Sequence, residues 1–130
     1  MTKPFRYFRD PLFLAALGVF ALNEVLLKSA FSSVFMRNHL NDLLLVPCAL
    51  PPLLRLHAAL GLRPLVNAPS AIEIAGHLLV WSILFEVAGP ILAAHSTGDF
   101  LDILCYWLGG CCSWCLWNAT DQPFCRKSPA

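Results

Sequence analysis

The sequence predicts an all-α fold, a bundle of four membrane-spanning helices in which prolines kink or break the second helix. Of its 130 residues, 58% are hydrophobic and only 13% are charged, whereas an average soluble domain carries about 25% charged residues. A soluble fold of this size would lack the interior volume to bury so much apolar surface. Four apolar segments have the length, about 20 residues, that a helix needs to cross a ~30 Å hydrocarbon core. These segments are residues 11–30, 39–60, 70–92 and 98–117, within a single membrane domain over 1–130 that ends in a polar tail, 118–130.

The first span begins with a helix-start signal. Pro11 fits the first helical turn, and Asp10 before it can cap the helix. Three basic residues precede the apolar stretch, as in a secretory signal peptide, but apolar character continues as far as Leu27. We therefore favour a membrane span over a cleaved signal peptide.

The second span is the most irregular one. Pro47, Pro51 and Pro52 lie within it, and a proline removes a helix hydrogen bond and clashes with the preceding turn. The stretch between Asp42 and Arg55 covers only about 18 Å as a helix. We therefore expect a kinked or broken helix in which Asp42 lies below the membrane surface or Arg55 extends toward water.

The third and fourth spans carry acidic residues near one end. Glu86 follows the apolar run LLVWSILF in the third span, and Asp99 and Asp102 open the fourth. The dipole of a helix stabilises negative charge in its first turn. Gly109 and Gly110, further along the fourth span, allow a neighbouring helix to approach closely.

The basic residues predict the orientation of the chain. Lysine and arginine accumulate on the cytoplasmic side of membrane proteins. Four spans place Lys28 and Arg37 on one side and all other basic residues on the opposite side, so we expect both termini in the cytoplasm. With a net charge of +1 and no basic stripe, the lipid bilayer is the expected partner and nucleic acid is not. The cytoplasmic group consists of Lys3, Arg6, Arg9, Arg55, Arg63, Arg126 and Lys127.

In this topology, four helix ends bring polar side chains to one depth near the outer face. An ionisable group within a span is costly and usually faces the bundle interior or a wet cavity. Oxygen ligands at this density suit a divalent cation such as Mg²⁺. Protons, or the polar head of a lipid or glycan precursor, are alternative occupants. The candidate ligand-binding residues are Asn41, Asp42, Glu86, Asp99, Asp102 and Tyr106.

A structural interpretation is open for several polar residues. The two acids of the fourth span can cap its helix, and Glu24 can pair with Lys28 one turn later. At the inner end of the third span, Glu73 and His77 are four residues apart and are expected to pair. Glu86 has no such local explanation, so it is the strongest candidate for a functional role.

Nothing in the sequence indicates catalysis. There is no serine in a nucleophile elbow and no glycine-rich phosphate loop, and only His39 and His95 are available as bases near the outer face. Cys112 and Cys115 form a CxxC pair, for which zinc or redox chemistry is an alternative. Because the pair lies in an apolar helix without a second CxxC, helix packing and interface anchoring explain it better. We therefore expect no enzymatic activity and no catalytic residue.

The C-terminal half resembles the C-terminal signature of VanZ-like small membrane proteins. In that signature a Glu late in one span precedes a short polar link, an Asp, a polar residue four positions on and a Gly three further. Glu86, Asp102, Tyr106 and Gly109 follow this spacing, with Tyr106 where the pattern usually has Asn. VanZ-like proteins are associated with reduced susceptibility to glycopeptide antibiotics, so the resemblance implies contact with the outer face and with cell-envelope chemistry.

Most of the chain is also similar to a group of short four-span bacterial proteins. They carry an LNDLL…P element, here residues 40–44 with Pro47, and a final FE…P…TxDxxDxxxYxxGG pattern, here Phe85 to Gly110. Such proteins are sometimes labelled magnesium citrate secondary transporters. The similarity implies a multi-pass protein of the bacterial cytoplasmic (inner) membrane.

Three classes of function follow from these observations. The favoured one is a non-enzymatic integral membrane protein whose outer acidic cluster binds a cation or a polar envelope ligand. The second is a small secondary transporter, assembled as a homo-oligomer, for a cation or a metal–citrate complex. The third is a structural subunit whose acids pair with cations of a membrane partner protein.

Overall fold

The computed structural model describes residues 4–92 and 99–119 and is all-α. Four of its helical segments are long and apolar enough to span a membrane: Pro11–Ala30, Val34–Ala59, Ala71–Leu92 and Phe100–Ala119. No strand occurs among the described residues. The predicted fold class is therefore confirmed. The predicted polar tail falls outside the described residues, apart from its first two positions, which belong to the last helix.

The first span is interrupted by a π-helical segment. It consists of α1 (Pro11–Leu22), the π-helix η2 (Asn23–Leu27) and α2 (Lys28–Ala30), and the short 3₁₀ helix η1 (Tyr7–Arg9) precedes it. Asp10 caps α1 as predicted, because its carboxylate accepts a hydrogen bond from the N–H of Phe13 at 3.0 Å.

The second and third spans are also composite. The second consists of α3 (Val34–Asn38) and α4 (Leu40–Ala59). The third consists of α5 (Ala71–Ser82), the π-helix η3 (Ile83–Ala88) and α6 (Gly89–Leu92). A π-bulge shifts the helical register by one residue and is frequent at functional sites.

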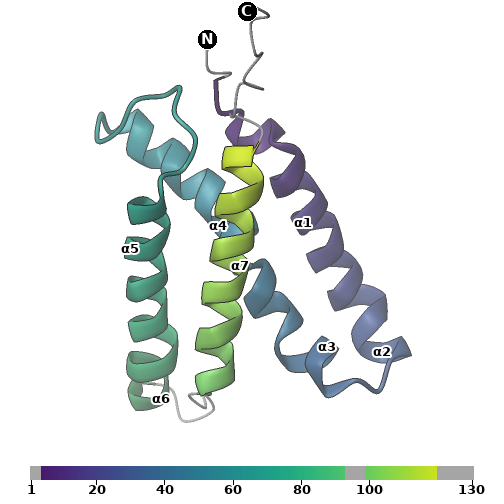
Figure 1. Ribbon diagram of the computed structural model, residues 1–130. Coiled ribbons are helices and arrows are strands. Elements are labelled where there is room, and N and C mark those ends of the chain that lie inside the picture. Colours follow the sequence, from purple (N-terminus) through teal and green to yellow (C-terminus); the bar gives the residue numbers. More distant parts are fainter. Residues whose placement is uncertain (1–3, 93–98, 120–130) are drawn as a thin grey trace, which may run out of the picture.

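The fourth span, α7 (Phe100–Ala119), packs against both α4 and α5. In Figure 1, α5 runs beside α7, α4 crosses behind it obliquely, and α1 lies on the side away from α5. The N-terminus of α1, the C-terminus of α4 and the C-terminus of α7 lie at one end of the bundle, here called the terminal end. The helices α2, α3 and α6 lie at the other end, here called the distal end. The core between α4, α5 and α7 includes Val46, Leu50, Leu54, Ile74, Leu78 and Tyr106.

The prolines of the second span do not break its helix. Helix α4 continues through all three of them, and the interruption lies instead at His39, ahead of α4. Because Pro47 has no N–H, the carbonyl oxygen of Leu43 loses its helix donor. Gly109 of α7 packs against this oxygen so closely that an added Cβ would overlap it. The missing side chain thus lets α7 cover the carbonyl group that Pro47 leaves free.

The second glycine of the pair faces a different helix. A Cβ added to Gly110 would lie 2.6 Å from Cδ1 of Leu78 and 3.3 Å from Cγ2 of Ile74, both on α5. The pair therefore lets α7 approach α4 on one side and α5 on the other, which is the close approach that the sequence predicts.

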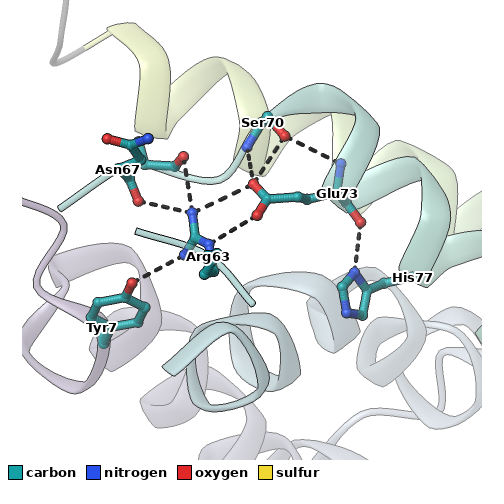
Figure 2. Close-up of polar contacts among 7 residues, drawn as sticks. Tyr7, Arg63, Asn67, Ser70, Glu73 and His77 are labelled. Carbon is teal, nitrogen blue, oxygen red and sulfur yellow. Dashed lines mark hydrogen bonds and ion pairs between the residues drawn. The ribbon is translucent and has the colours of Figure 1, made fainter. Parts of the chain in front are cut away.

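A closed polar network holds the terminal end together. The guanidinium group of Arg63 lies between the hydroxyl of Tyr7 and the carboxylate of Glu73, as Figure 2 shows. Its nitrogen atoms lie 2.9 Å from Oε1 of Glu73, 3.1 Å from the Tyr7 hydroxyl and 3.0 Å from the carbonyl oxygen of Asn67. The side chain of Arg63 is only 5% exposed. The network joins the segment before α1 to the link between α4 and α5.

Glu73 does not pair with His77 in the way that the sequence predicts. Its carboxylate turns back toward Ser70, completing a capping box at the start of α5, and also meets Arg63. His77 instead lies with Nδ1 2.6 Å from the backbone carbonyl oxygen of Glu73 (Figure 2). The prediction failed because the cap and a cation outside the helix compete for the same carboxylate.

Candidate functional site

A polar pocket of about 410 Å³ opens near the distal end of the bundle. Residues of α1, α4, η3, α6 and α7 contribute to its wall. Five of the six residues that the sequence selects are among them. The lining consists of Phe20, Asn41, Asp42, Leu45, Phe85, Glu86, Gly89, Asp102 and Tyr106.

The side chains best placed to hold a metal ion together are those of one histidine and two aspartates. Nδ1 of His39 lies 2.7 Å from Oδ1 of Asp102, and one ligand atom from each of His39, Asp42 and Asp102 lies within 4.8 Å of the others. His39 stands at the interruption before α4, Asp42 in the first turn of α4, and Asp102 in the first turn of α7. The side chains of His39 and Asp102 are 11% and 20% exposed, so the cluster is shielded from solvent but not sealed.

Glu86 binds the start of α7 through neutral donors. Its Oε1 accepts a hydrogen bond from the hydroxyl of Tyr106 at 2.9 Å, and its Oε2 accepts one from the backbone N–H of Asp99 at 2.7 Å. Neither donor carries a positive charge. Glu86 therefore fixes the position of α7 while its own negative charge is left without an ion-pair partner among the described residues.

Asp99 does not contribute its carboxylate to the pocket wall. The carboxylate accepts a hydrogen bond from the N–H of Leu101 at 2.9 Å, which is the helix-start role that the sequence left open. The backbone N–H of Asp99, not its side chain, donates the hydrogen bond to Glu86. Of the predicted ligands, Asp99 is the one that the structure leaves outside the pocket.

Asn41 connects the pocket to the first span. Its side-chain oxygen accepts a hydrogen bond from Nδ2 of Asn23 at 2.9 Å, and its Nδ2 donates to Oε1 of Glu24. Glu24 also forms the expected ion pair with Lys28, so its charge is compensated. Asn23 is fully buried and donates a second bond, to the carbonyl oxygen of Met36. The π-helix η2 thus contacts the pocket through Asn41, and η3 contributes Glu86 to it directly.

Two of these residues, His39 and Asn23, are not among the candidate ligands that the sequence predicts. The sequence suggests His39 only as a base, although its spacing of three from Asp42 places both on one helical face. Asn23 has no sequence signal beyond being polar within an apolar run. In the structure its Nδ2 donates two hydrogen bonds, whereas its buried Oδ1 accepts none. His39 changes the chemistry of the site, because imidazole nitrogen is a preferred ligand of transition metals.

The charges around the pocket do not balance. Asp42, Glu86 and Asp102 line it, and no lysine or arginine does so among the described residues. Among the described residues, the group in contact with these carboxylates that can carry positive charge is the imidazole of His39, 2.7 Å from Asp102. Carboxylates within a membrane-spanning bundle are costly unless cations or protons neutralise them. The pocket is therefore a place where positive charge is stabilised.

The four spans and this pocket define the class of the molecule, a multi-pass α-helical membrane protein with a polar pocket between its helices. No family model matches the chain, and no curated protein or solved structure is significantly similar to it. The resemblance to VanZ-like proteins stays a prediction.

Proposed function

We propose that this protein is a non-enzymatic membrane protein that binds a divalent transition-metal cation in the distal pocket. The observation that carries the proposal is the convergence of His39, Asp42 and Asp102, which come from two spans and offer ligand atoms within 4.8 Å of one another. One imidazole nitrogen with two carboxylate oxygens is a common ligand set for ions such as Zn²⁺ and Mn²⁺.

The spacing of these atoms suits a small cation. Metal–ligand bonds of about 2.1 Å place neighbouring ligands of a tetrahedral ion roughly 3.4 Å apart. Three atoms within 4.8 Å reach this spacing through small side-chain adjustments. Asn41 and Glu86 line the same pocket and offer further oxygen atoms. Three protein ligands with space beside them leave room for water or for a bound molecule.

The ligand set distinguishes between candidate occupants. Mg²⁺ prefers oxygen ligands and retains several waters, so His39 favours a transition metal over Mg²⁺. A metal–citrate complex is disfavoured for a separate reason. Citrate would bring its negative charges to a wall that already carries Asp42, Glu86 and Asp102, and like charges repel strongly where water is scarce.

We place the protein in a bacterial inner membrane with the terminal end in the cytoplasm, so that the pocket faces outward. Support comes from the excess of lysine and arginine at the terminal end. A thiol reagent that does not cross membranes should label Ser32→Cys at the distal end in intact cells, but label Val66→Cys only after lysis. Both residues are exposed, and both variants are made after replacing the native cysteines. The reverse pattern would overturn the orientation.

Metal binding is tested with Mn²⁺, which favours oxygen ligands over thiols and so avoids the exposed cysteines of α7. In purified protein treated with a chelator, Mn²⁺ should raise the unfolding temperature and bind with one-to-one stoichiometry. His39→Gln and Asp102→Asn should each weaken binding by at least ~10-fold. His57→Gln is the matched control, since His57 packs against the ring of His77 rather than the pocket. Equal Mn²⁺ affinity in all four proteins would overturn the proposal.

Transport is the rival class, and flux separates it from binding. Protein reconstituted into liposomes should bind Mn²⁺ without moving it across the membrane. Mn²⁺ uptake that His39→Gln abolishes would assign the same site to a transporter instead.

A further inference from the structure

The pocket also has aromatic walls. Phe20 of α1, Phe85 of η3 and Tyr106 of α7 all line it. The rings of Phe85 and Tyr106 lie with centroids 6.4 Å apart and planes inclined at 57°, so they form two walls of a corner. Glu86 follows Phe85 in the chain, and its Oε1 accepts a hydrogen bond from the hydroxyl of Tyr106. The aromatic residues and the carboxylate of Glu86 therefore line the same pocket.

Glu86 retains capacity to bind a cation. A carboxylate offers about four lone-pair positions, and Tyr106 and Asp99 occupy two of them. Both donors are neutral, so the charge of Glu86 still attracts a positive group. A metal ion held by His39 would not use the aromatic walls, because metals at protein sites bind nitrogen, oxygen or sulfur atoms. The rings thus have no role in the proposed metal site.

From this arrangement we propose a second binding function: the corner formed by Phe20, Phe85, Tyr106 and Glu86 binds an organic ammonium cation. A quaternary or primary ammonium group over aromatic faces is stabilised by the ring quadrupole. Glu86 supplies the counter-charge. The pocket volume of about 410 Å³ lies within the usual range for small-molecule sites, about 300–1,000 Å³. This function shares the pocket with the metal but does not depend on it.

The ammonium group can come from a dissolved amine or from a lipid headgroup. Glu86 and Tyr106 each lie about 9 Å along their helices from the distal ends of their spans. Phe20 and Phe85 are 37% and 47% exposed on the surface of the spanning segments, where acyl chains would lie in a membrane. The ammonium group is common to both sources, and the experiment separates them.

The test uses choline and its neutral isostere 3,3-dimethylbutan-1-ol, with metal-free protein in nanodiscs of phosphatidylglycerol. Choline should bind in calorimetry and raise the unfolding temperature, and the neutral isostere should do neither. Phe85→Leu should weaken choline binding by roughly 3- to 30-fold through the lost ring contact. Phe100→Leu is the control, because it removes an exposed ring that does not line the pocket. His39→Gln should bind choline like the unmodified protein.

Nanodiscs of phosphatidylcholine identify the source. If the lipid headgroup enters the pocket, the apparent affinity for added choline falls in these discs; if only dissolved amines enter, it stays the same. The proposal is overturned if choline and its neutral isostere bind equally, or if Phe85→Leu and Phe100→Leu bind choline alike. If His39→Gln loses Mn²⁺ binding but still binds choline, the metal site and the ammonium site are independent of each other.

Discussion

The two ends of the bundle handle charge in opposite ways. At the terminal end, Arg63 and Glu73 form an ion pair at 2.9 Å, and Tyr7 and backbone carbonyl groups occupy the other nitrogen atoms of the guanidinium. At the distal end, three carboxyl groups line one pocket, no lysine or arginine of the described residues lines it, and the imidazole of His39 contacts Asp102. The terminal end is thus a closed network in which a cation and a carboxylate pair with each other, whereas the distal end has carboxyl groups in excess.

This difference distinguishes polar groups that stabilise the fold from polar groups that are available to bind a ligand. A charge that meets its counter-charge within the chain holds helices together, and removing one partner exposes the cost of burying the other. A charge that faces a cavity without a partner reduces the stability of the bundle and is tolerated only where an external cation offsets it. If this is correct, substitutions at the two ends should change stability with opposite signs.

The largest effect is expected from Arg63→Ala. It would leave the carboxylate of Glu73 beside the bundle without its cation and remove the donors to Tyr7 and the link before α5. We expect a loss of about 3 kcal/mol of unfolding free energy, measured by denaturant unfolding in detergent micelles. Arg9→Ala, at an exposed position, should change it by less than about 0.5 kcal/mol. If Arg63→Ala and Arg9→Ala both change the unfolding free energy by a similarly small amount, the closed network does not stabilise the terminal end.

Gly109→Ala should cost about 2 kcal/mol of unfolding free energy and also weaken Mn²⁺ binding. The new Cβ would overlap the Leu43 carbonyl, so α7 must move away from α4, and such overpacking costs about 1–3 kcal/mol. Since Asp42 and Asp102 lie on these two helices, Mn²⁺ affinity should fall as well. Gly76→Ala is the matched control, because no atom lies within 4 Å of a Cβ there, and it should stabilise α5 by about 0.5–1 kcal/mol. Unchanged Mn²⁺ affinity in Gly109→Ala would show that the helix contact does not set the site.

Ser70→Ala tests the helix cap within the closed network. The hydroxyl of Ser70 accepts a hydrogen bond from the N–H of Glu73 and donates one to its carboxylate, so its removal should cost about 1 kcal/mol. Ser33→Ala is the comparison, since Ser33 occupies the same position before α3 but makes no capping bond. Thermal unfolding of the two variants should differ by several degrees, and equal midpoints would contradict the capping role.

Local patterns in the sequence predicted one part of this structure well. The apolar segments and their lengths predicted the four spans, the Asp10–Pro11 pair predicted the start of α1, and spacing of four predicted the Glu24–Lys28 pair. Each of these depends on neighbours within one helix. The exclusion of isolated acids from apolar surroundings predicted that polar side chains of four helix ends would lie at one depth, and those of three spans line one pocket.

What the sequence did not show depends on contacts between distant segments. Arg63 lies in a link, and its partner Tyr7 is separated from it by the whole of the first two spans, so no periodicity relates them. The π-helices η2 and η3 shift the register of two spans and so decide which side of each helix Asn23 and Glu86 occupy. His39 belongs to the site because α3 ends before it. The interruption there leaves the imidazole ring of His39 next to Asp102. Helical spacing alone contains none of this information.

The smallest expected effect has the opposite sign to the others. Asp42→Asn removes the repulsion between two carboxylates that lie within 4.8 Å of each other, an interaction of about 1 kcal/mol even at the dielectric constant of water. Metal-free Asp42→Asn should therefore be more stable than the unmodified protein by up to about 1 kcal/mol. In saturating Mn²⁺ the order should reverse, because only the unmodified protein gains the free energy of binding. Glu73→Gln at the terminal end, measured alongside, should be destabilised with or without Mn²⁺. If Asp42→Asn lowers stability in both conditions, then Asp42 is held by partners within the chain, and the distal end is a second closed network.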